Sequence, residues 1–221
     1  MNEKDSENKE QSHSKAERDE QLLNSVRIII NVLYALMIFQ IFLILPRPGD
    51  PELEYNSLDQ IFSENLNVLL VMVVGLVMTI TYWIQFNKLM GNLVKSSAVH
   101  SVLVLAQMFL LMVYLYFMRF DIEFDGPVIA LEMESVFLSL AGFTGVAGWI
   151  YAQHRGLISD QINKKEQLAT LYGILPEPVA ALFSLPFAVY GPGIWTLSFL
   201  IIIPITLYLN WRSKRLFPPD A

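Results

Sequence analysis

The sequence contains no cysteine, and only 16% of its 221 residues are charged. The lack of cysteine excludes disulfides, thiolate metal sites and cysteine nucleophiles. The low charge argues against a soluble domain, in which about 25% of the residues are charged. The net charge is -6 at pH 7 and the basic residues form no cluster, so we expect no nucleic-acid partner.

Sequence motifs of common enzymes are also absent. The chain has no Walker A loop, no GxGxxG, no HExxH and no G-x-S-x-G. The longest stretch between apolar runs covers about residues 46–65, which is too short for a catalytic domain. We therefore expect no enzymatic activity, no cofactor and no metal site.

Hydrophobic residues make up 54% of the chain and gather in long runs. A helix needs about 20 apolar residues to cross roughly 30 Å of hydrocarbon. Six runs of about this length cover residues 23–45, 66–86, 98–118, 130–152, 166–190 and 192–211. They predict an all-α, polytopic integral membrane protein with six transmembrane helices. Prolines 176, 178, 186 and 204 lie in the last two spans, so we expect both to be kinked and packed inside the bundle.

Both ends of the chain differ from this central part. The first 22 residues carry eleven charges of both signs and almost no apolar side chain, which predicts a disordered cytoplasmic tail over residues 1–22. The acidic start is unlike a signal peptide, so we expect the first span to remain in the protein. Residues 23–211 form the predicted transmembrane domain, and residues 212–221 form a cytoplasmic C-terminal tail.

The basic residues predict the orientation in the membrane. Thirteen of the 15 lie in the N-terminal tail, at the start of span one, between spans two and three, between spans four and five, or after span six. The loops at residues 46–65 and 119–129 are acidic instead. Loops rich in lysine and arginine stay in the cytoplasm, so both termini are predicted to be cytoplasmic, with the lipid bilayer of the cell membrane as the first partner.

Polar residues in the first span lie on two faces. A stripe on the cytoplasmic half consists of Asn24, Arg27, Asn31 and Tyr34. Gln40 lies on the opposite side, with Leu36 and Leu43 before and after it. One interpretation is that the stripe packs into its own subunit while the other face lines a pathway. The alternative is that Arg27 reaches the membrane surface and the amides form ordinary interhelical hydrogen bonds of about 1 kcal/mol each.

The other spans contain a few polar residues with open roles. Glu177, between two prolines, is a candidate intramembrane ion or proton ligand, or is solvated if the span begins after Pro178. His100 could titrate near neutral pH, or simply form a hydrogen bond. Glu132 and Glu134 are expected at the membrane interface. Small residues on span four predict a helix-packing face: Ser139, Gly142, Gly145 and Gly148.

Three stretches carry a family resemblance: residues 82–89 (YWIQFNKL), 149–157 (WIYAQHRGL) and 185–192 (LPFAVYGP). With the order of the spans, they resemble the transmembrane protein 175 potassium channels in their short prokaryotic form, over about residues 23–211. The resemblance implies a homotetramer in which the first helix of each subunit lines a central pore for monovalent cations. It also implies an aliphatic constriction, which falls here at Leu36, Gln40 and Leu43.

The chain departs from the family pattern at two motifs. Of the signature Arg-x-x-x-Phe-Ser-Asp in the first span, only Arg27 matches, and Phe86 and Asn87 replace histidines of the second span. These departures allow a diverged channel with altered conduction. Two other functions stay open, namely a non-conducting membrane scaffold of the same fold and a small-solute transporter that uses Glu177.

Overall fold

The computed structural model describes residues 3–43, 66–124 and 126–216. Its elements are α1 (Glu3–Phe42), α3 (Leu66–Gly91), α4 (Ala98–Glu123), α5 (Val128–His154), α6 (Lys164–Ile174), α7 (Pro176–Ser184), η1 (Leu185–Tyr190), α8 (Pro192–Ser198), η2 (Phe199–Ile201) and α9 (Ile202–Leu216). The all-α prediction is confirmed for these residues, since every named element is a helix. The acidic loop predicted at residues 46–65 lies outside them.

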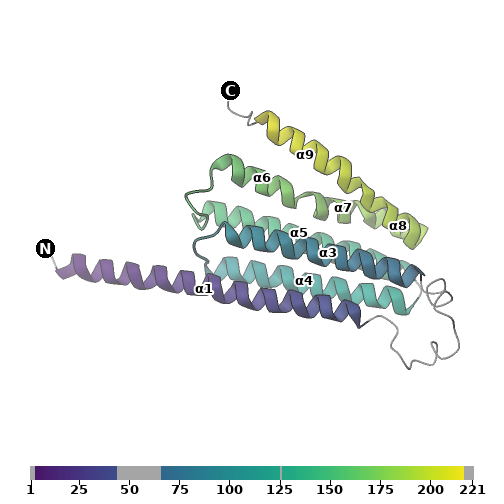
Figure 1. The fold of residues 1–221 in the computed structure, drawn as a ribbon, viewed down its shortest axis with the longest axis horizontal. Coiled ribbons are helices and arrows are strands. Elements are labelled where there is room, and N and C mark those ends of the chain that lie inside the picture. Colours follow the sequence, from purple (N-terminus) through teal and green to yellow (C-terminus); the bar gives the residue numbers. More distant parts are fainter. Residues whose placement is uncertain (1–2, 44–65, 125, 217–221) are drawn as a thin grey trace.

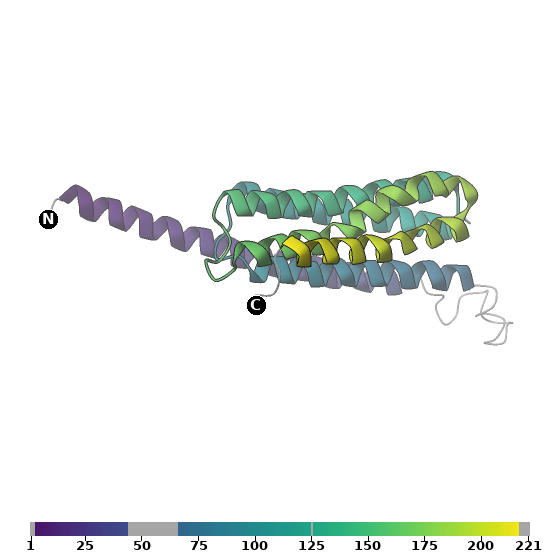
Figure 2. The ribbon, with the colours of Figure 1, turned by 90° about the horizontal axis from the view of Figure 1, so that it is seen from above.

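The long helices lie lengthwise beside one another in a bundle (Figures 1 and 2). The most extensive contact joins α4 to α5, while α1 packs on α3 and α4. The segments α6, α7 and η1 cover the other side of α5, and α9 packs on the outer side of α6 and α7. We call the end near Lys95 and Arg155 the basic end, and the end near Asp121 and Gly126 the acidic end.

Among the described residues, five helical segments are long and apolar enough to cross a membrane: Ser14–Phe42, Ala98–Glu123, Val128–His154, Lys164–Tyr190 and Pro192–Ser213. They are compatible with a multi-pass membrane protein. The expected span over residues 66–86 is not among them, although these residues belong to α3, a 26-residue helix of the same bundle.

Proline interrupts the fifth expected span. The helix α6 ends at Ile174 and α7 begins at Pro176, while Pro186 lies in the 3-10 helix η1. Proline has no N–H to donate and its ring blocks the preceding turn, so a regular helix cannot pass through it. The predicted kinks in this span are confirmed.

The sixth expected span is exposed, contrary to the prediction that it packs inside the bundle. Only 6% of its most apolar stretch is buried, because α9 touches α6 and α7 along one side. An apolar helix needs no protein cover in a membrane, since lipid tails are as apolar as its own side chains. This span therefore leaves a wide apolar surface for lipid or another subunit.

Helices extend beyond residues 23–211 at both ends. The helix α1 starts at Glu3 and runs without a break through residue 22, and its first part projects beyond the bundle (Figure 1). Glutamate, lysine, glutamine and alanine favour helix even without an apolar face. At the other end α9 continues past residue 211 to Leu216.

The small residues of α5 let two helices approach closely. A Cβ atom on Gly142 would lie 2.6 Å from the Pro178 side chain of α7, and one on Gly145 would lie 2.7 Å from Gln107 Nε2 of α4. The Ser139 hydroxyl donates a hydrogen bond of 3.1 Å to the Pro178 carbonyl oxygen. The packing face predicted on span four is therefore confirmed.

Candidate functional site

The helix α1 has a buried side and an exposed side. The buried side consists of residues three or four apart: Leu23, Val26, Ile30, Tyr34, Met37 and Ile41. Leu36 is 53% exposed, Leu43 is 45% exposed, and Gln40 between them is also exposed. The three residues expected at a constriction therefore lie together on the outside of the single chain.

Contacts between α1 and α3 indicate the depth of Gln40. Arg27 contacts Met90 and Asn31 contacts Trp83, which shows that the two helices run in opposite directions. Continued along the helices, this pairing puts Gln40 level with about Val77, near the middle of α3. The Gln40 amide is thus far from both ends of the bundle.

The polar stripe of α1 faces α3 at the basic end. Arg27 Nη2 donates a hydrogen bond of 2.8 Å to the Met90 carbonyl oxygen, and Trp83 Nε1 donates one of 2.9 Å to Asn31 Oδ1. Tyr34 is buried against the Phe86 ring, with 5.9 Å between ring centroids. The fourth member, Asn24, is exposed.

Two glutamates lie in the interior of the bundle. Glu134 of α5 is 1% exposed and interacts electrostatically with Asp121 of α4. Glu177, in the first turn of α7, is 9% exposed, and its side chain is hydrogen-bonded to that of Gln85 on α3. Within the described part of the chain, Glu134 Oε1 and Glu177 Oε2 have no hydrogen-bond partner.

The position of Glu134 corrects the expectation that it lies at the membrane interface. It stands on the same face of α5 as Gly145, because 11 residues correspond to about three whole helical turns, and Gly142 lies about 80° to one side. That face packs on α4 and α7, so the carboxyl group is enclosed. Glu132 points elsewhere and is only half-buried. The shared face with the glycines was the signal in the sequence that distinguishes the two glutamates.

Three buried tyrosines interact with these carboxyl groups or with one another. Tyr82 interacts electrostatically with both Glu177 and Tyr34, and Tyr114 does so with Glu134, Asp121 and Tyr82. The Tyr82 hydroxyl donates a hydrogen bond of 3.2 Å to the Leu138 carbonyl oxygen. The Tyr34 hydroxyl, on a side chain that is 1% exposed, has no partner among the described residues. The sequence prediction included only Tyr34 of these three.

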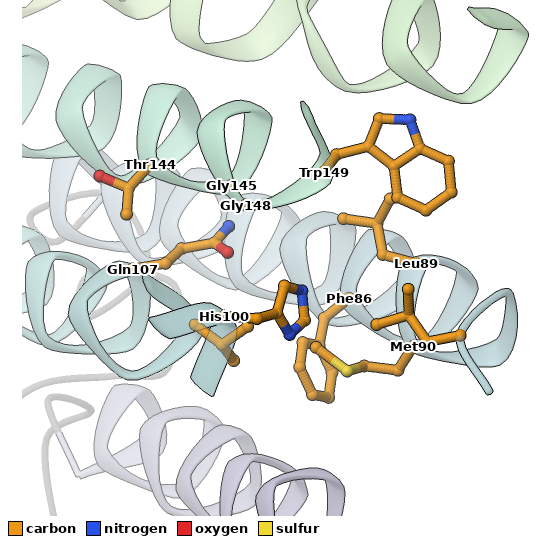
Figure 3. A pocket seen from close by; sticks show the side chains of 11 residues that line it. Phe86, Leu89, Met90, His100, Gln107, Thr144, Gly145, Gly148 and Trp149 are labelled. Atoms are coloured by element: carbon orange, nitrogen blue, oxygen red, sulfur yellow. The ribbon is translucent and has the colours of Figure 1, made fainter. Parts of the chain in front are cut away.

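A small cavity lies between α3, α4 and α5, toward the basic end of the bundle (Figure 3). Its volume is about 20 Å³, which is enough for one water molecule. Its polar lining comes from His100, Gln107 and Thr144. The His100 ring is buried, and its Nδ1 lies 3.0 Å from Ser96 Oγ at the basic end.

No group of three or more histidine, aspartate or glutamate side chains is placed to hold a metal ion in the described part of the chain. No protein-family model matches the sequence, and no curated protein matches it. The arrangement of the side chains thus carries the functional argument.

Proposed function

We propose that this chain is the subunit of a homotetrameric channel for monovalent cations, with potassium as the expected ion. In this proposal α3 also crosses the membrane and brings the number of spans to six, both termini lie in the cytoplasm, and the protein resides in the cell membrane. The exposed side of α1, with Leu36, Gln40 and Leu43, faces a central pore. The observation that carries the proposal is the exposed Gln40 amide at mid-depth on an otherwise apolar helix side.

The energetic argument concerns the amide of Gln40. An amide with no hydrogen-bond partner in hydrocarbon costs several kcal/mol, so lipid is a poor neighbour for it. A pore along a symmetry axis would supply water or a second copy of the same residue. Rings of leucine can stop ions by excluding water, and a ring of amides between them would hold water.

A second argument comes from the amount of exposed apolar surface. Very little of the segment Pro192–Ser213 is fully buried, and one side of α1 is exposed. A tetramer could cover part of this surface, and lipid would cover the rest. The resemblance to the transmembrane protein 175 channels implies the same assembly, with α1 at the axis.

Gln40 variants test the proposal in liposomes that hold the purified full-length protein. Gln40→Leu would extend the apolar ring and is expected to reduce potassium flux while the tetramer stays intact. Gln40→Ala would widen the ring and is expected to raise the leak. Val102→Leu is the control, because Val102 is 63% exposed on α4, away from the proposed pore side.

Measurements on the same samples separate the pore from the alternatives. Potassium flux is read with a fluorescent indicator, and the subunit number is read by light scattering or native mass spectrometry. Unchanged flux in both Gln40 variants would remove this face from the pore. A stable tetramer without potassium flux would favour the membrane scaffold, and a monomer in several detergents and in nanodiscs would exclude the central pore.

A further inference from the structure

The interior of the single subunit contains a row of polar groups that the proposed central pore does not use. They lie on the inward sides of α3, α4, α5 and α7, whereas the Gln40 side of α1 faces outward. Ionisable residues inside a membrane bundle are costly and are usually kept for ion or proton movement. The row therefore requires an explanation of its own.

The half of the row near the acidic end consists of carboxyl and hydroxyl groups that interact electrostatically. Asp121, in the last turn of α4, interacts with Glu134, and both interact with Tyr114. Tyr114 interacts with Tyr82, which in turn interacts with Glu177. The groups thus extend from the acidic end of the bundle toward Glu177.

The middle of the row is packed around the glycines of α5. A Cβ atom on Gly142 would lie 2.8 Å from the Tyr82 hydroxyl, and one on Gly145 would lie 2.7 Å from Gln107 Nε2. These glycines are three residues apart on one face of α5, so the Tyr82 hydroxyl and the Gln107 amide lie about one helical turn apart. Gln107 on α4 is therefore the next polar group after Tyr82 on α3 in the direction of the basic end.

The half of the row near the basic end includes the cavity of about 20 Å³. Gln107 and His100 line it, and Figure 3 shows both side chains on the same side, opposite Gly145 and Gly148. The His100 ring is hydrogen-bonded to Ser96, which follows α3 at the basic end. The Ser96 Oγ atom also lies 3.2 Å from Ser101 Oγ. One water molecule in the cavity could bridge Gln107 and His100.

We propose that these groups form a proton pathway through the interior of each subunit, with Glu177 at its midpoint. Three observations converge on a proton ligand. Glu134 Oε1, Glu177 Oε2 and the Tyr34 hydroxyl are buried oxygens without partners among the described residues. The row extends along the bundle from Asp121 in the last turn of α4 to Ser96 before the first turn of α4. No three of its acidic or histidine side chains converge as metal ligands within the described ranges.

Each step of the pathway transfers one proton and requires no other reactant. An O–H or N–H bond breaks at the donor as a new one forms at the acceptor, directly or through a water molecule. Asp121, Glu134, Glu177 and His100 take up and release the proton. Tyrosine hydroxyls and the glutamine amides orient the intervening hydrogen bonds.

The pathway is tested by proton flux into liposomes that contain the full-length protein and a pH-sensitive dye. A potassium gradient with valinomycin sets the membrane potential. Glu177→Gln and Glu134→Gln are expected to lower proton flux by at least about a hundredfold, the low end of what loss of a positioned proton-transfer group costs. Glu132→Gln, a half-buried glutamate on the same helix as Glu134, is the matched control and should keep the flux of the unaltered protein.

Two further measurements keep the result interpretable if a variant is unstable. Glu177→Asp retains a carboxyl group, so it should restore part of the flux that Glu177→Gln loses. Thermal unfolding of each variant shows whether the bundle remains folded. Absence of proton flux through the unaltered protein, equal flux in the glutamine variants, or equal loss in Glu177→Asp and Glu177→Gln would overturn the proposal.

The proton pathway and the central pore can fail independently. Gln40→Leu should change potassium flux and leave proton flux unchanged, because Gln40 lies outside the row. Glu134→Gln should do the reverse. Loss of both fluxes in Glu134→Gln, with the bundle folded, would place proton movement in the central pore and overturn the separate pathway.

Discussion

Arg27 of α1 donates a hydrogen bond of 2.8 Å to the carbonyl oxygen of Met90, in the last turn of α3. The last carbonyl groups of a helix lack partners and carry partial negative charge, which a guanidinium group offsets. The contact also sets the rotation of α1. Leu36, nine residues later, points away from Arg27 by about 180° and therefore away from α3.

The orientation of the chain in the membrane can be tested with single cysteines, because the natural sequence has none. Phe124→Cys at the acidic end is expected to react with an impermeant maleimide from outside the cell. Asp160→Cys at the basic end should react only after the cytoplasmic side is opened. Both sites are exposed in the folded chain, and the reverse labelling pattern would invert the proposed orientation.

Gly142→Ala is expected to destabilise the bundle by about 1–3 kcal/mol, the usual cost of overpacking. The new Cβ would lie 2.6 Å from Pro178 Cβ, and the proline ring cannot rotate away. Thermal unfolding in detergent measures the effect. Gly148→Ala is the control on the same helix, because its Cβ would meet Leu103 at an ordinary 3.9 Å. Equal melting temperatures for the two variants would contradict the close approach of α7.

The bond between Trp83 and Asn31 is expected to couple α1 to α3. A double-mutant cycle with Trp83→Phe and Asn31→Ala should give an interaction free energy of about 0.6 kcal/mol, and at most about 1.7 kcal/mol, as for other hydrogen bonds between membrane helices. The free energy of unfolding is measured for both single variants and the double variant. Strict additivity would mean that the 2.9 Å contact adds nothing to stability.

Ser135→Ala should destabilise the acidic end of the bundle by about 1–3 kcal/mol, because it leaves a buried donor without an acceptor. Trp195 Nε1 donates to Ser135 Oγ over 2.8 Å, and Ser135 Oγ lies 2.8 Å from Ser184 Oγ. Trp195 fluorescence during unfolding reports the change. Thr144→Ala, which removes only a bond to its own helix at Leu140, should stay within about 0.5 kcal/mol of the unaltered protein.

Local features of the sequence were enough to predict most of the helices. Runs of apolar residues placed them because a helix must satisfy its own backbone in hydrocarbon. Pro176 and Pro186 predicted the kinks, because a missing donor acts within one or two turns. The small residues of α5 predicted close packing for a similar reason, since a glycine lets a neighbouring helix approach closely only at its own position.

The candidate sites depended on contacts that the sequence does not record. Glu132 and Glu134 are two residues apart with the same side chain, yet only Glu134 is enclosed by α4 and α7. Likewise no sequence pattern singled out Tyr82 and Tyr114, which interact electrostatically with Glu177 and Glu134 in the folded chain. Such groups acquire a role only from their neighbours on other helices.

The sequence by itself determined that the chain is helical and where its helices break, since both follow from chemistry within a few residues. Only the tertiary structure decided which side of each helix is enclosed. In a membrane protein the apolar residues that face lipid resemble those that face other helices, so helical periodicity alone cannot separate the two sides. For that reason the exposure of Gln40 and α9 and the burial of Glu134 emerged only from the packing of the helices.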